Sequence, residues 1–300
     1  MSDRSVLVTG ATGNQGGAVI DHLLSAGDFD VYGLTRDATS DAARTLADRG
    51  VEMVEGDLYD TDSMRPHVAG MDAVFAVTNF WTEGYDRQVE QGENIVDVAA
   101  EADVDQFVFS GVGSHHRETG VPHFDSAWEI EQHARNRDLP LTVLQPVFFF
   151  QNFEAFAEDI LEGTIALPLA EDVSLQMVDV EDVGRAAAVA LAEPETFVGE
   201  RFEVAGDELT LSETAEVLST VTGVDVAPYP VPIEEAYESF GEEFTVMCEW
   251  FNAVGYDADI DALSETFDLA FTTLEEYLRE HGWEDKTGMA SVPGWVKAME

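Results

Sequence analysis

Three glycines near the N-terminus have the spacing of a phosphate-binding loop. Gly10, Gly13 and Gly16 follow the apolar run Ser5–Thr9, which has the pattern of a buried strand, and they precede a segment with helical spacing. At such a junction the first glycine permits a tight turn, the second lets the backbone approach a pyrophosphate, and the third lets the helix pack closely on the strand. The free N–H groups at the start of that helix attract phosphate oxygens. The predicted dinucleotide-binding loop consists of Gly10, Thr12, Gly13, Asn14, Gln15 and Gly16.

A charged residue after the second predicted strand, Val31–Thr35, bears on the choice of dinucleotide. This residue is Arg36. An Asp or Glu at this point usually binds the ribose hydroxyls of NAD, whereas an arginine accommodates the 2′-phosphate of NADP. Asp37 is adjacent and no second cation is nearby, so a merely solvent-exposed arginine is the alternative interpretation. We predict NADP as the cofactor, with NAD as the alternative.

The elements that would position these residues alternate between strand and helix through the first half of the chain. Helical patterns cover residues 40–49, 62–69, 86–102 and 126–137. The alternation predicts the α/β class, with a Rossmann-type doubly wound parallel sheet in a domain of residues 1–152. The predicted strands are Ser5–Thr9, Val31–Thr35, Val51–Glu55, Ala73–Val77, Gln106–Ser110 and Leu141–Leu144.

The pattern is looser in residues 153–300, for which we predict a smaller, mostly helical substrate or partner region. Some of its segments are expected to return to the first domain. Pro228, Pro230 and Pro232 make Ala227–Pro232 an extended connector, because they prevent a regular helix. The predicted strands are Ser174–Val178 and Arg201–Ala205, and the predicted helices cover 153–162, 182–192, 212–222, 233–254 and 273–281.

The chain is extremely acidic. It has 14 Lys and Arg residues against 61 Asp and Glu residues, a formal net charge of −47 that is spread over its whole length. Self-repulsion on this scale is relieved by salt, because the Debye length falls to ~3 Å at 1 M. We interpret the composition as that of a halophilic archaeal protein that works in multimolar salt. Nucleic acid and anionic membrane surfaces are excluded as partners, since both require basic patches.

Other features bound the class of protein. No apolar run approaches the ~20 residues of a membrane span, and the N-terminus leads directly into the first predicted strand, which leaves no room for a signal peptide. Cys248 is the only cysteine, which excludes an intramolecular disulfide and a cysteine-based metal site. We therefore expect a cytoplasmic protein.

Several motifs together resemble the NmrA-like family, atypical members of the short-chain dehydrogenase superfamily, and within it the HSCARG-type branch. They are VTGATGNQGG (8–17), EGD (55–57), VTNFW (77–81), VPHFDS (121–126) and the stretch 146–152. The resemblance implies a Rossmann domain that binds NAD(P). It also implies adenine contacts at Asp57 and Leu58, diphosphate and nicotinamide contacts at Thr78, Asn79 and Phe80, and nicotinamide contacts at Phe149 and Asn152.

The catalytic pair typical of the superfamily is missing. A tyrosine there donates a proton, and a lysine four residues later lowers the tyrosine pKa and binds the ribose. None of the seven tyrosines of this chain has a lysine at that spacing. By resemblance His123 takes the tyrosine position and Ala127 the lysine position, while Glu93 stands where many relatives carry lysine. His123 and Ser110, which ends a predicted strand, remain weak catalytic candidates.

A metal site is not predicted. His115 and His116 are adjacent, and with His123 they could suggest ligands, but adjacent loop histidines are more often solvated.

Two functions follow from these observations. Within the family that the sequence resembles, some members are nicotinamide-sensing regulators and others reduce quinones or isoflavonoids. Because the catalytic pair is absent, the first prediction is an NADP(H)-binding redox or cofactor sensor, with a protein partner or a homodimer as its readout. The alternative is an NAD(P)H-dependent oxidoreductase that acts on a quinone-like or other small carbonyl acceptor, since direct hydride transfer needs only stacking and alignment. Whether the protein is an enzyme is left open, with a preference for the regulator.

Overall fold

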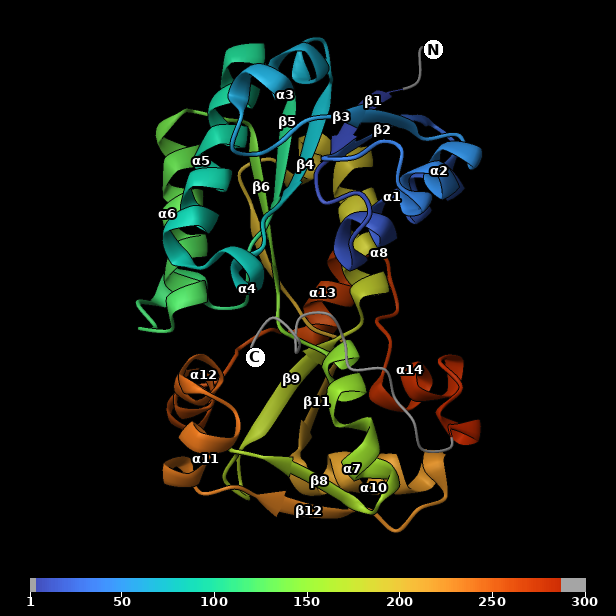
Figure 1. The fold of residues 1–300 in the computed structure, drawn as a ribbon, viewed down its shortest axis with the longest axis vertical. Helices are drawn as coiled ribbons and strands as arrows, with labels where there is room; N and C mark the ends of the chain where they lie inside the picture. The colour runs from blue at the N-terminus through green and yellow to red at the C-terminus, as the bar shows by residue number, and fades with distance from the viewer. Residues whose placement is uncertain (1–3, 287–300) are drawn as a thin grey trace. The chain divides into compact units, whose positions relative to one another are not determined.

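The computed structural model describes residues 4–286, and its contacts divide the chain into two units. Unit 1 comprises residues 4–118, His123–Gln145 and Val180–Phe202. Unit 2 comprises Thr119–Pro122, Pro146–Asp179 and residues 203–286. The chain therefore leaves unit 1 after residue 145 and returns to it at residue 180, as its colours along the ribbon of Figure 1 show.

Unit 1 is built on a seven-stranded sheet with the order β10-β6-β5-β4-β1-β2-β3. The ladders that join β3, β2, β1, β4, β5 and β6 are all parallel, which confirms the predicted doubly wound sheet. Strand order reverses between β1 and β4, and in such sheets ligands bind outside the carboxyl ends of the strands at this point. The strands are β1 (Arg4–Val8), β2 (Phe29–Thr35), β3 (Glu52–Glu55), β4 (Ala73–Val77), β5 (Gln106–Ser110), β6 (Leu141–Pro146) and β10 (Arg201–Val204).

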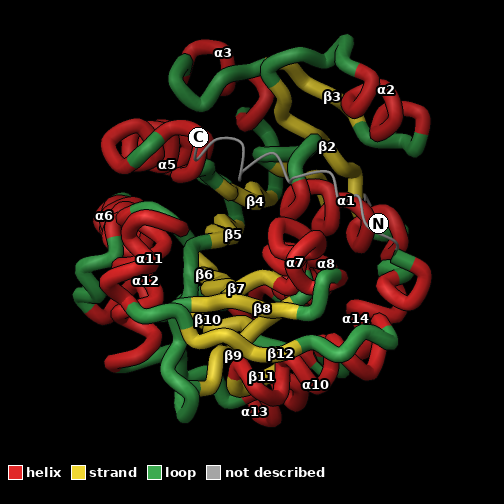
Figure 2. Tube along the Cα trace, turned by 60° about the horizontal axis from the view of Figure 1, so that its bottom comes forward, coloured by secondary structure: helices red, strands yellow, loops and turns green. Residues whose placement is uncertain are grey.

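Helices cover both faces of this sheet. Figures 1 and 2 show α3, α5 and α6 on one face and α1 and α8 on the other. The helices of unit 1 are α1 (Asn14–Ala26), α2 (Asp41–Asp48), α3 (Thr61–Val68), α4 (Phe80–Glu83), α5 (Tyr85–Ala102), α6 (Pro122–Asn136), α8 (Val180–Ala192) and α9 (Pro194–Phe197), with the 3-10 turn η1 (His115–Arg117).

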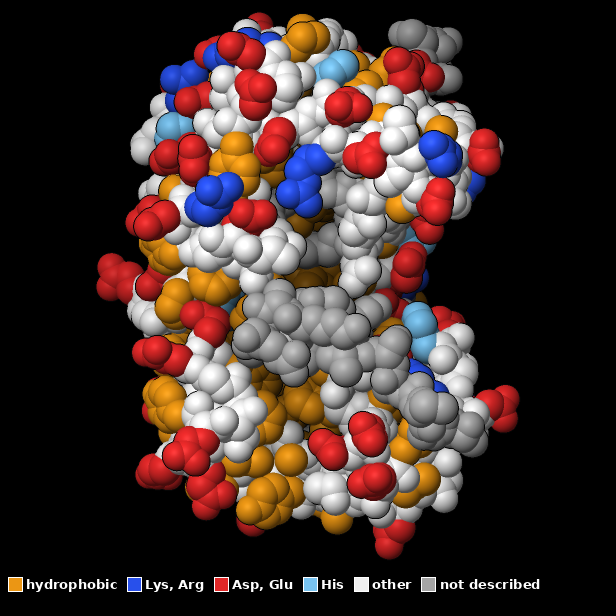
Figure 3. All heavy atoms as spheres, viewed as in Figure 1, with side chains coloured by type: hydrophobic (Ala, Val, Ile, Leu, Met, Phe, Trp, Pro, Cys, Tyr) orange, Lys and Arg blue, Asp and Glu red, His pale blue; other side chains and the backbone are white. Residues whose placement is uncertain are grey.

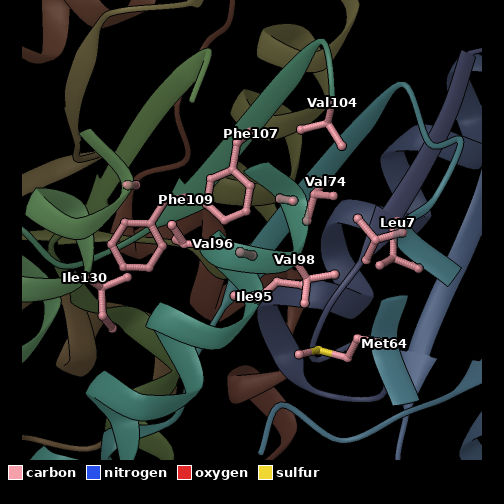
Figure 4. Close-up of a cluster of buried hydrophobic side chains, with 14 of the residues drawn as sticks. Leu7, Met64, Val74, Ile95, Val96, Val98, Val104, Phe107, Phe109 and Ile130 are labelled. Atoms are coloured by element: carbon pink, nitrogen blue, oxygen red, sulfur yellow. The ribbon is translucent and has the colours of Figure 1, made fainter. Parts of the chain in front are cut away.

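The core of unit 1 joins the sheet to these helices. Phe107 and Phe109 of β5 are buried beside Val96 of α5 and Ile130 of α6, as Figure 4 shows. On the opposite face α1 and α8 approach so closely that a Cβ on Gly184 would lie 2.7 Å from the backbone of Ala18. Burial of these apolar side chains on both faces stabilises the sheet and holds the carboxyl ends of its strands in register.

Unit 2 combines helices with two small sheets of order β11-β9-β7 and β12-β8. Its strands are β7 (Phe148–Phe149), β8 (Thr164–Leu167), β9 (Ser174–Val178), β11 (Asp207–Thr210) and β12 (Ala227–Pro230). Its helices are η2 (Phe150–Phe156), α7 (Ala157–Leu161), α10 (Leu211–Thr222), α11 (Ile233–Ser239), α12 (Glu242–Ala253), α13 (Ile260–Phe267), α14 (Leu274–Glu280) and η3 (Trp283–Asp285).

Two predictions for this half need correction. The proline-rich segment is a strand paired with β8 rather than a connector. The Ala227 N–H donates to the carbonyl of Gly163, directly before β8, and the Val231 N–H donates to the carbonyl of Leu167 in β8. Pro228 and Pro230 occupy the alternate positions, which a strand edge tolerates. The single helix expected over 233–254 is divided into α11 and α12 at Gly241, whose φ of +81° ends the helical path.

The surface reflects the composition. Asp and Glu side chains are scattered over the face drawn in Figure 3, and Lys and Arg side chains are few. Among the helices of residues 4–286, none is long and apolar enough to cross a membrane.

Candidate functional site

The glycine loop after β1 has the close packing that its spacing predicted. Gly10 has a φ of +59°, and a Cβ there would lie 2.8 Å from Cγ1 of Val77. A Cβ on Gly16 would overlap the carbonyl group of Gly10, lying 2.6 Å from its carbon, and would be 2.8 Å from the carbonyl oxygen of Thr9. Gly10 therefore requires glycine because its φ lies in the left-handed region, and Gly16 requires it because contacts with backbone cannot be relieved by a side-chain movement.

The first turn of α1 offers backbone donors to a ligand. Gly13 is the N-cap in an extended conformation and provides no side-chain cap, and no acidic residue lies in the first turn. The first N–H groups of a helix have no intrahelical acceptor, and the helix dipole adds partial positive charge there. Thr12, Gly13 and Asn14 are exposed. An uncapped helix end beside a glycine-rich loop fits a pyrophosphate.

The end of β4 is fixed directly beside this loop. The Thr9 hydroxyl donates to the carbonyl oxygen of Val77 at 3.0 Å, and the Val77 N–H donates back to that hydroxyl at 2.9 Å. Thr78 and Asn79 therefore leave the sheet next to Gly10, where strand order reverses. The Asn79 side chain caps α4 by accepting from the Thr82 N–H at 3.3 Å, and Phe80 is the first residue of that helix.

Arg36 lies at the end of β2, the neighbour of β1, and its side chain is exposed. Within residues 4–286 it is the only Lys or Arg side chain without a hydrogen bond or ion pair to the protein. Asp37 does not neutralise it. The Asp37 carboxylate accepts from the Thr39 hydroxyl at 2.6 Å and the Thr39 N–H at 2.8 Å, and these hydrogen bonds hold its pKa below the ordinary value.

Asp57 and Leu58 follow β3, which pairs with β2 through Thr35 and Glu55. The Asp57 carboxylate accepts from the Tyr59 N–H at 3.0 Å, which forms a tight turn, and the Leu58 carbonyl accepts from the Asn94 amide at 2.8 Å. The predicted adenine residues and Arg36 therefore leave adjacent parallel strands at the same edge of the sheet.

The two catalytic candidates have different surroundings. The buried Ser110 hydroxyl, at the end of β5, donates to Oε1 of Gln15 at 2.7 Å and so connects β5 to the glycine loop. His123 lies on α6 and is 8% exposed. Its ring centroid is 5.5 Å from that of Phe80, 5.1 Å from Trp81 and 4.6 Å from Phe124. These three rings enclose the imidazole of His123 in an aromatic environment near the end of β4. Trp81 was not among the predicted site residues.

Ala127 and Glu93, which the resemblance placed at lysine positions of the family, make other contacts in this structure. Ala127 is 2% exposed and belongs to the core cluster that includes Ile130. Glu93 faces His133, with 3.7 Å between Oε1 and Nδ1. Neither position therefore provides a charge that could assist proton transfer from His123.

The expectation that His115 is solvated is wrong. His115 is completely buried, and its Nε2 hydrogen-bonds to Glu131 at 2.6 Å while its Nδ1 accepts from the Val112 N–H at 3.2 Å. Glu131, also completely buried, accepts in addition from Arg135 and Arg201. Burial acts to raise the pKa of Glu131, but hydrogen bonds from His115 and Arg201 outweigh it and lower the pKa to about 2.

A metal centre is not visible among residues 4–286, where no group of three or more His, Cys, Asp or Glu side chains is arranged to hold an ion. Phe149 and Asn152 lie in unit 2, Phe149 in β7 opposite Val178 of β9, and Asn152 in η2. Their predicted contact with the nicotinamide stays a prediction.

Sequence reasoning missed two buried polar residues beside the site. Gln88 of α5 donates to the Thr78 hydroxyl, and Ser126 of α6 donates to Gln88. A signal was present, because Gln88 shares the buried face of α5 with Ile95. A polar residue on a buried helix face must find a partner.

A doubly wound sheet with a glycine loop at its topological switch point defines a dinucleotide-binding protein of the Rossmann type. The model of the NmrA-like family matches residues 2–278, and the chain belongs to this family.

Relatives and solved structures agree with this assignment. An NmrA-like family domain-containing protein of Dictyostelium discoideum is 30% identical over 92% of this chain and 97% of its own length. The NAD(P)H azoreductase of Xenophilus azovorans is 30% identical over 78% and 79%, respectively. The triphenylmethane reductase of Citrobacter sp., solved with NADP(H), has a TM-score of 0.81 and 25% identity, covering 92% of this chain and 99% of that one. The negative transcriptional regulator NmrA, solved with NADP, shares the fold, with a TM-score of 0.76, 21% identity, and 93% and 95% coverage.

Proposed function

We propose that this protein is an NADP(H)-dependent reductase of planar, conjugated acceptors such as quinones. The observation that carries the proposal is the aromatic surround of His123, formed by Phe80, Trp81 and Phe124 beside the end of β4. Flat rings stack favourably on aromatic side chains, and these residues lie at the edge of the sheet that carries the glycine loop. Two of the similar proteins are reductases named for the azo group and for triphenylmethane compounds.

NADP is the proposed cofactor. The loop Gly10–Gly16 and the uncapped start of α1 would hold the pyrophosphate, and the unpaired guanidinium of Arg36 would hold the 2′-phosphate. The solved triphenylmethane reductase and the regulator NmrA both contain NADP(H) or NADP.

The residues of this chain would complete the reduction as follows. Bound NADPH supplies a hydride to the acceptor. Phe80 and Trp81 would orient the acceptor by stacking. His123 would deliver the proton that the reduced oxygen takes up, so that a quinone gains one hydride and one proton and becomes the neutral hydroquinone, and the imidazole would regain its proton from water. No Tyr-Lys pair is needed, because a quinone accepts hydride without prior protonation.

A redox-sensing regulator is the second candidate, and the position of Ala127 favours it. Ala127 is buried in the core, so the superfamily's means of lowering a proton donor's pKa is absent at that position. In this role differential affinity for NADP⁺ and NADPH would shift the protein between two conformations, read by a protein partner or within a homodimer. The preference for a regulator that the sequence suggested stays a prediction.

The net charge supports a further proposal, that this protein works in the cytoplasm of a salt-accumulating archaeon. At a net charge of −47 the folded state is opposed by self-repulsion that salt would screen. The melting temperature is therefore expected to rise steadily between 0.2 M and 3 M KCl. A melting temperature that is flat or falls over this range would contradict the proposal.

One experiment separates the two functions. NADPH and NADH are each titrated into the protein in 2 M KCl, and nucleotide fluorescence is followed before and after addition of a benzoquinone, a naphthoquinone or an azo dye. Protein-dependent oxidation of NADPH that falls at least tenfold in Trp81→Ala supports the reductase. Tight NADPH binding without oxidation by either quinone or by an azo dye supports the regulator. If neither nucleotide binds to the folded protein, both functions are wrong.

A further inference from the structure

Three side chains form a hydrogen-bonded chain that links β4 to α5 and α6 within unit 1. The Gln88 amide nitrogen donates to the Thr78 hydroxyl oxygen at 3.0 Å. The Ser126 hydroxyl donates to the other end of the same amide, Oε1, at 2.5 Å. Ser126 also lies 3.2 Å from the carbonyl oxygen of His123, the preceding turn of α6. Gln88 and Ser126 are 7% and 0% exposed, so water does not compete for these bonds.

The two ends of the Gln88 amide differ chemically, and this gives the series of hydrogen bonds a direction. The amide NH₂ group can only donate, so the Thr78 oxygen acts as the acceptor. The hydroxyl hydrogen of Thr78 is then directed away from Gln88 and is available to another acceptor. Thr78 is half-buried and follows Val77, which is bonded to Thr9 directly before the glycine loop. An acceptor at this point of the sheet is a phosphate or ribose oxygen of a dinucleotide.

The carbonyl oxygen of the Gln88 amide helps to position the second candidate residue, His123. By accepting from Ser126, Gln88 holds the first turn of α6 against α5, and that turn carries His123. One buried amide therefore touches both the residue that would face the cofactor and the turn that carries the proposed proton donor.

We propose that Gln88 is a positioning residue of this site. It makes Thr78 a hydrogen-bond donor toward bound dinucleotide and keeps the His123 turn in place. The effect on binding is independent of turnover, whereas the effect on His123 rests on the proposed reductase function.

The test is a double-mutant cycle on NADPH affinity, measured by fluorescence titration of the full chain in 2 M KCl. Gln88→Met retains much of the side-chain volume without hydrogen bonds, and Thr78→Val retains shape without the hydroxyl. Each is expected to weaken NADPH binding about tenfold, as expected for a lost hydrogen bond to a charged group. Because Gln88 acts through Thr78, the two losses should not multiply. The double variant should bind NADPH at most about twofold more weakly than the single variant with the lower NADPH affinity. A product of the two factors, about a hundredfold, would overturn the proposal.

A second variant tests the direction of the chain. Gln88→Glu keeps the shape, but its carboxylate accepts at both ends, so the Thr78 hydroxyl must turn inward. NADPH affinity should fall at least as far as in Gln88→Met. The matched control is Gln91→Met, since Gln91 is also buried and lies one turn further along α5. Its affinity should stay within twofold of the unaltered protein, and an equal loss there would show a general packing effect and overturn the proposal.

The outcomes also separate this proposal from the proposed function. If the unaltered protein binds NADPH and the Gln88 variants bind it equally well, the role of Gln88 is wrong and the cofactor assignment stands. If the unaltered protein binds neither NADPH nor NADH, both are wrong. Where quinone reduction is observed, Gln88→Met should lower kcat at saturating NADPH, and an unchanged kcat would overturn the His123 part. Where quinone reduction is not observed, an unshifted imidazole NMR signal of His123 in Gln88→Met would overturn the His123 part.

Discussion

Unit 1 contains two groups of polar residues that differ in how their charges are satisfied. Around Glu131, deep in the fold, one carboxylate accepts hydrogen bonds from His115, Arg135 and Arg201. At the carboxyl end of the sheet, α1 begins without a side-chain cap, and Arg36 is the one cation of residues 4–286 that has no protein partner.

The difference indicates what each group is for. A buried charge without a partner costs several kcal/mol, so the cluster around Glu131 must be complete within the protein and serves the fold. Exposed donors without protein partners cost little and are available to a ligand. In a chain with a net charge of −47, an arginine free of carboxylate partners is a strong departure from its surroundings. The completed cluster around Glu131 therefore serves the fold, whereas the uncapped start of α1 and the unpaired Arg36 mark the candidate cofactor site.

The largest effect is expected from breaking the buried cluster. Glu131→Gln removes the negative charge and leaves Arg201 and His115 facing a neutral amide. It should lower the free energy of unfolding by about 3 kcal/mol, measured by urea denaturation in 2 M KCl. Glu90→Gln, at an exposed position on α5, is the control and should change it by less than about 0.5 kcal/mol. A loss in Glu131→Gln as small as in the control would show that the cluster is not stabilising.

The same cluster predicts a dependence on pH. The folded-state pKa of Glu131 is lowered to about 2 from an ordinary value of 4.5. A lowered pKa contributes stability that is fully present above about pH 4.5 and is lost as the pH falls toward 2, amounting to roughly 3 kcal/mol. The difference in unfolding free energy between the unaltered protein and Glu131→Gln should therefore shrink between pH 5 and pH 3. A difference that stays constant over this range would contradict the assigned pKa.

A smaller loss of stability is expected in the glycine loop, accompanied by loss of binding. Gly16→Ala would place a Cβ against the backbone of Gly10 and Thr9, so the loop must shift, at a cost of about 1–3 kcal/mol. NADPH affinity should fall at least tenfold. The neighbouring Gly17→Ala is a matched control, because its Cβ meets only the Ala11 carbonyl oxygen, at 3.9 Å. That variant should be as stable as the unaltered protein or up to about 1 kcal/mol more stable, since alanine favours the helix. Equal losses in both would refute the steric argument.

Arg36→Ala should affect binding alone. Without the guanidinium, NADPH affinity is expected to fall about 10- to 100-fold while NADH affinity changes by less than twofold, because only NADPH carries the 2′-phosphate. The control is Arg44→Ala, an exposed arginine already paired with Asp41. Parallel losses for both nucleotides would show that Arg36 does not read the phosphate.

The smallest effect concerns the partner of Asp37. Thr39→Ala removes the hydroxyl that holds the Asp37 carboxylate at 2.6 Å and leaves that carboxylate free to turn toward Arg36. NADPH affinity should fall about two- to threefold at low salt and less at 2 M KCl, where surface charges are screened. Thr45→Ala, whose hydroxyl bonds the carbonyl of Asp41, is the control. An unchanged affinity at low salt would mean that Asp37 does not compete for Arg36.

Much of unit 1 could be predicted because its signals are local. Apolar runs such as Ala73–Val77 and Gln106–Ser110 correspond to strands with the same bounds, since both faces of a parallel sheet are buried. In unit 2 the strands β8 and β11 have only four residues each and were missed. The prolines of β12 concealed its pairing, because a strand edge tolerates proline only where its N–H is not required.

By itself the sequence determined the doubly wound sheet, the glycine loop and the placement of Arg36 after the second strand. These depend on residue types within a few positions of one another, and the sterics of glycine and the periodicity of burial act over that range. Only the tertiary structure decided which side chains meet. It joined Ser110 to Gln15 across 95 positions, Glu131 to Arg201 across 70 and Gln88 to Ser126 across 38. A hydrogen bond between side chains on different elements depends on how those elements pack, and local pattern does not specify that register.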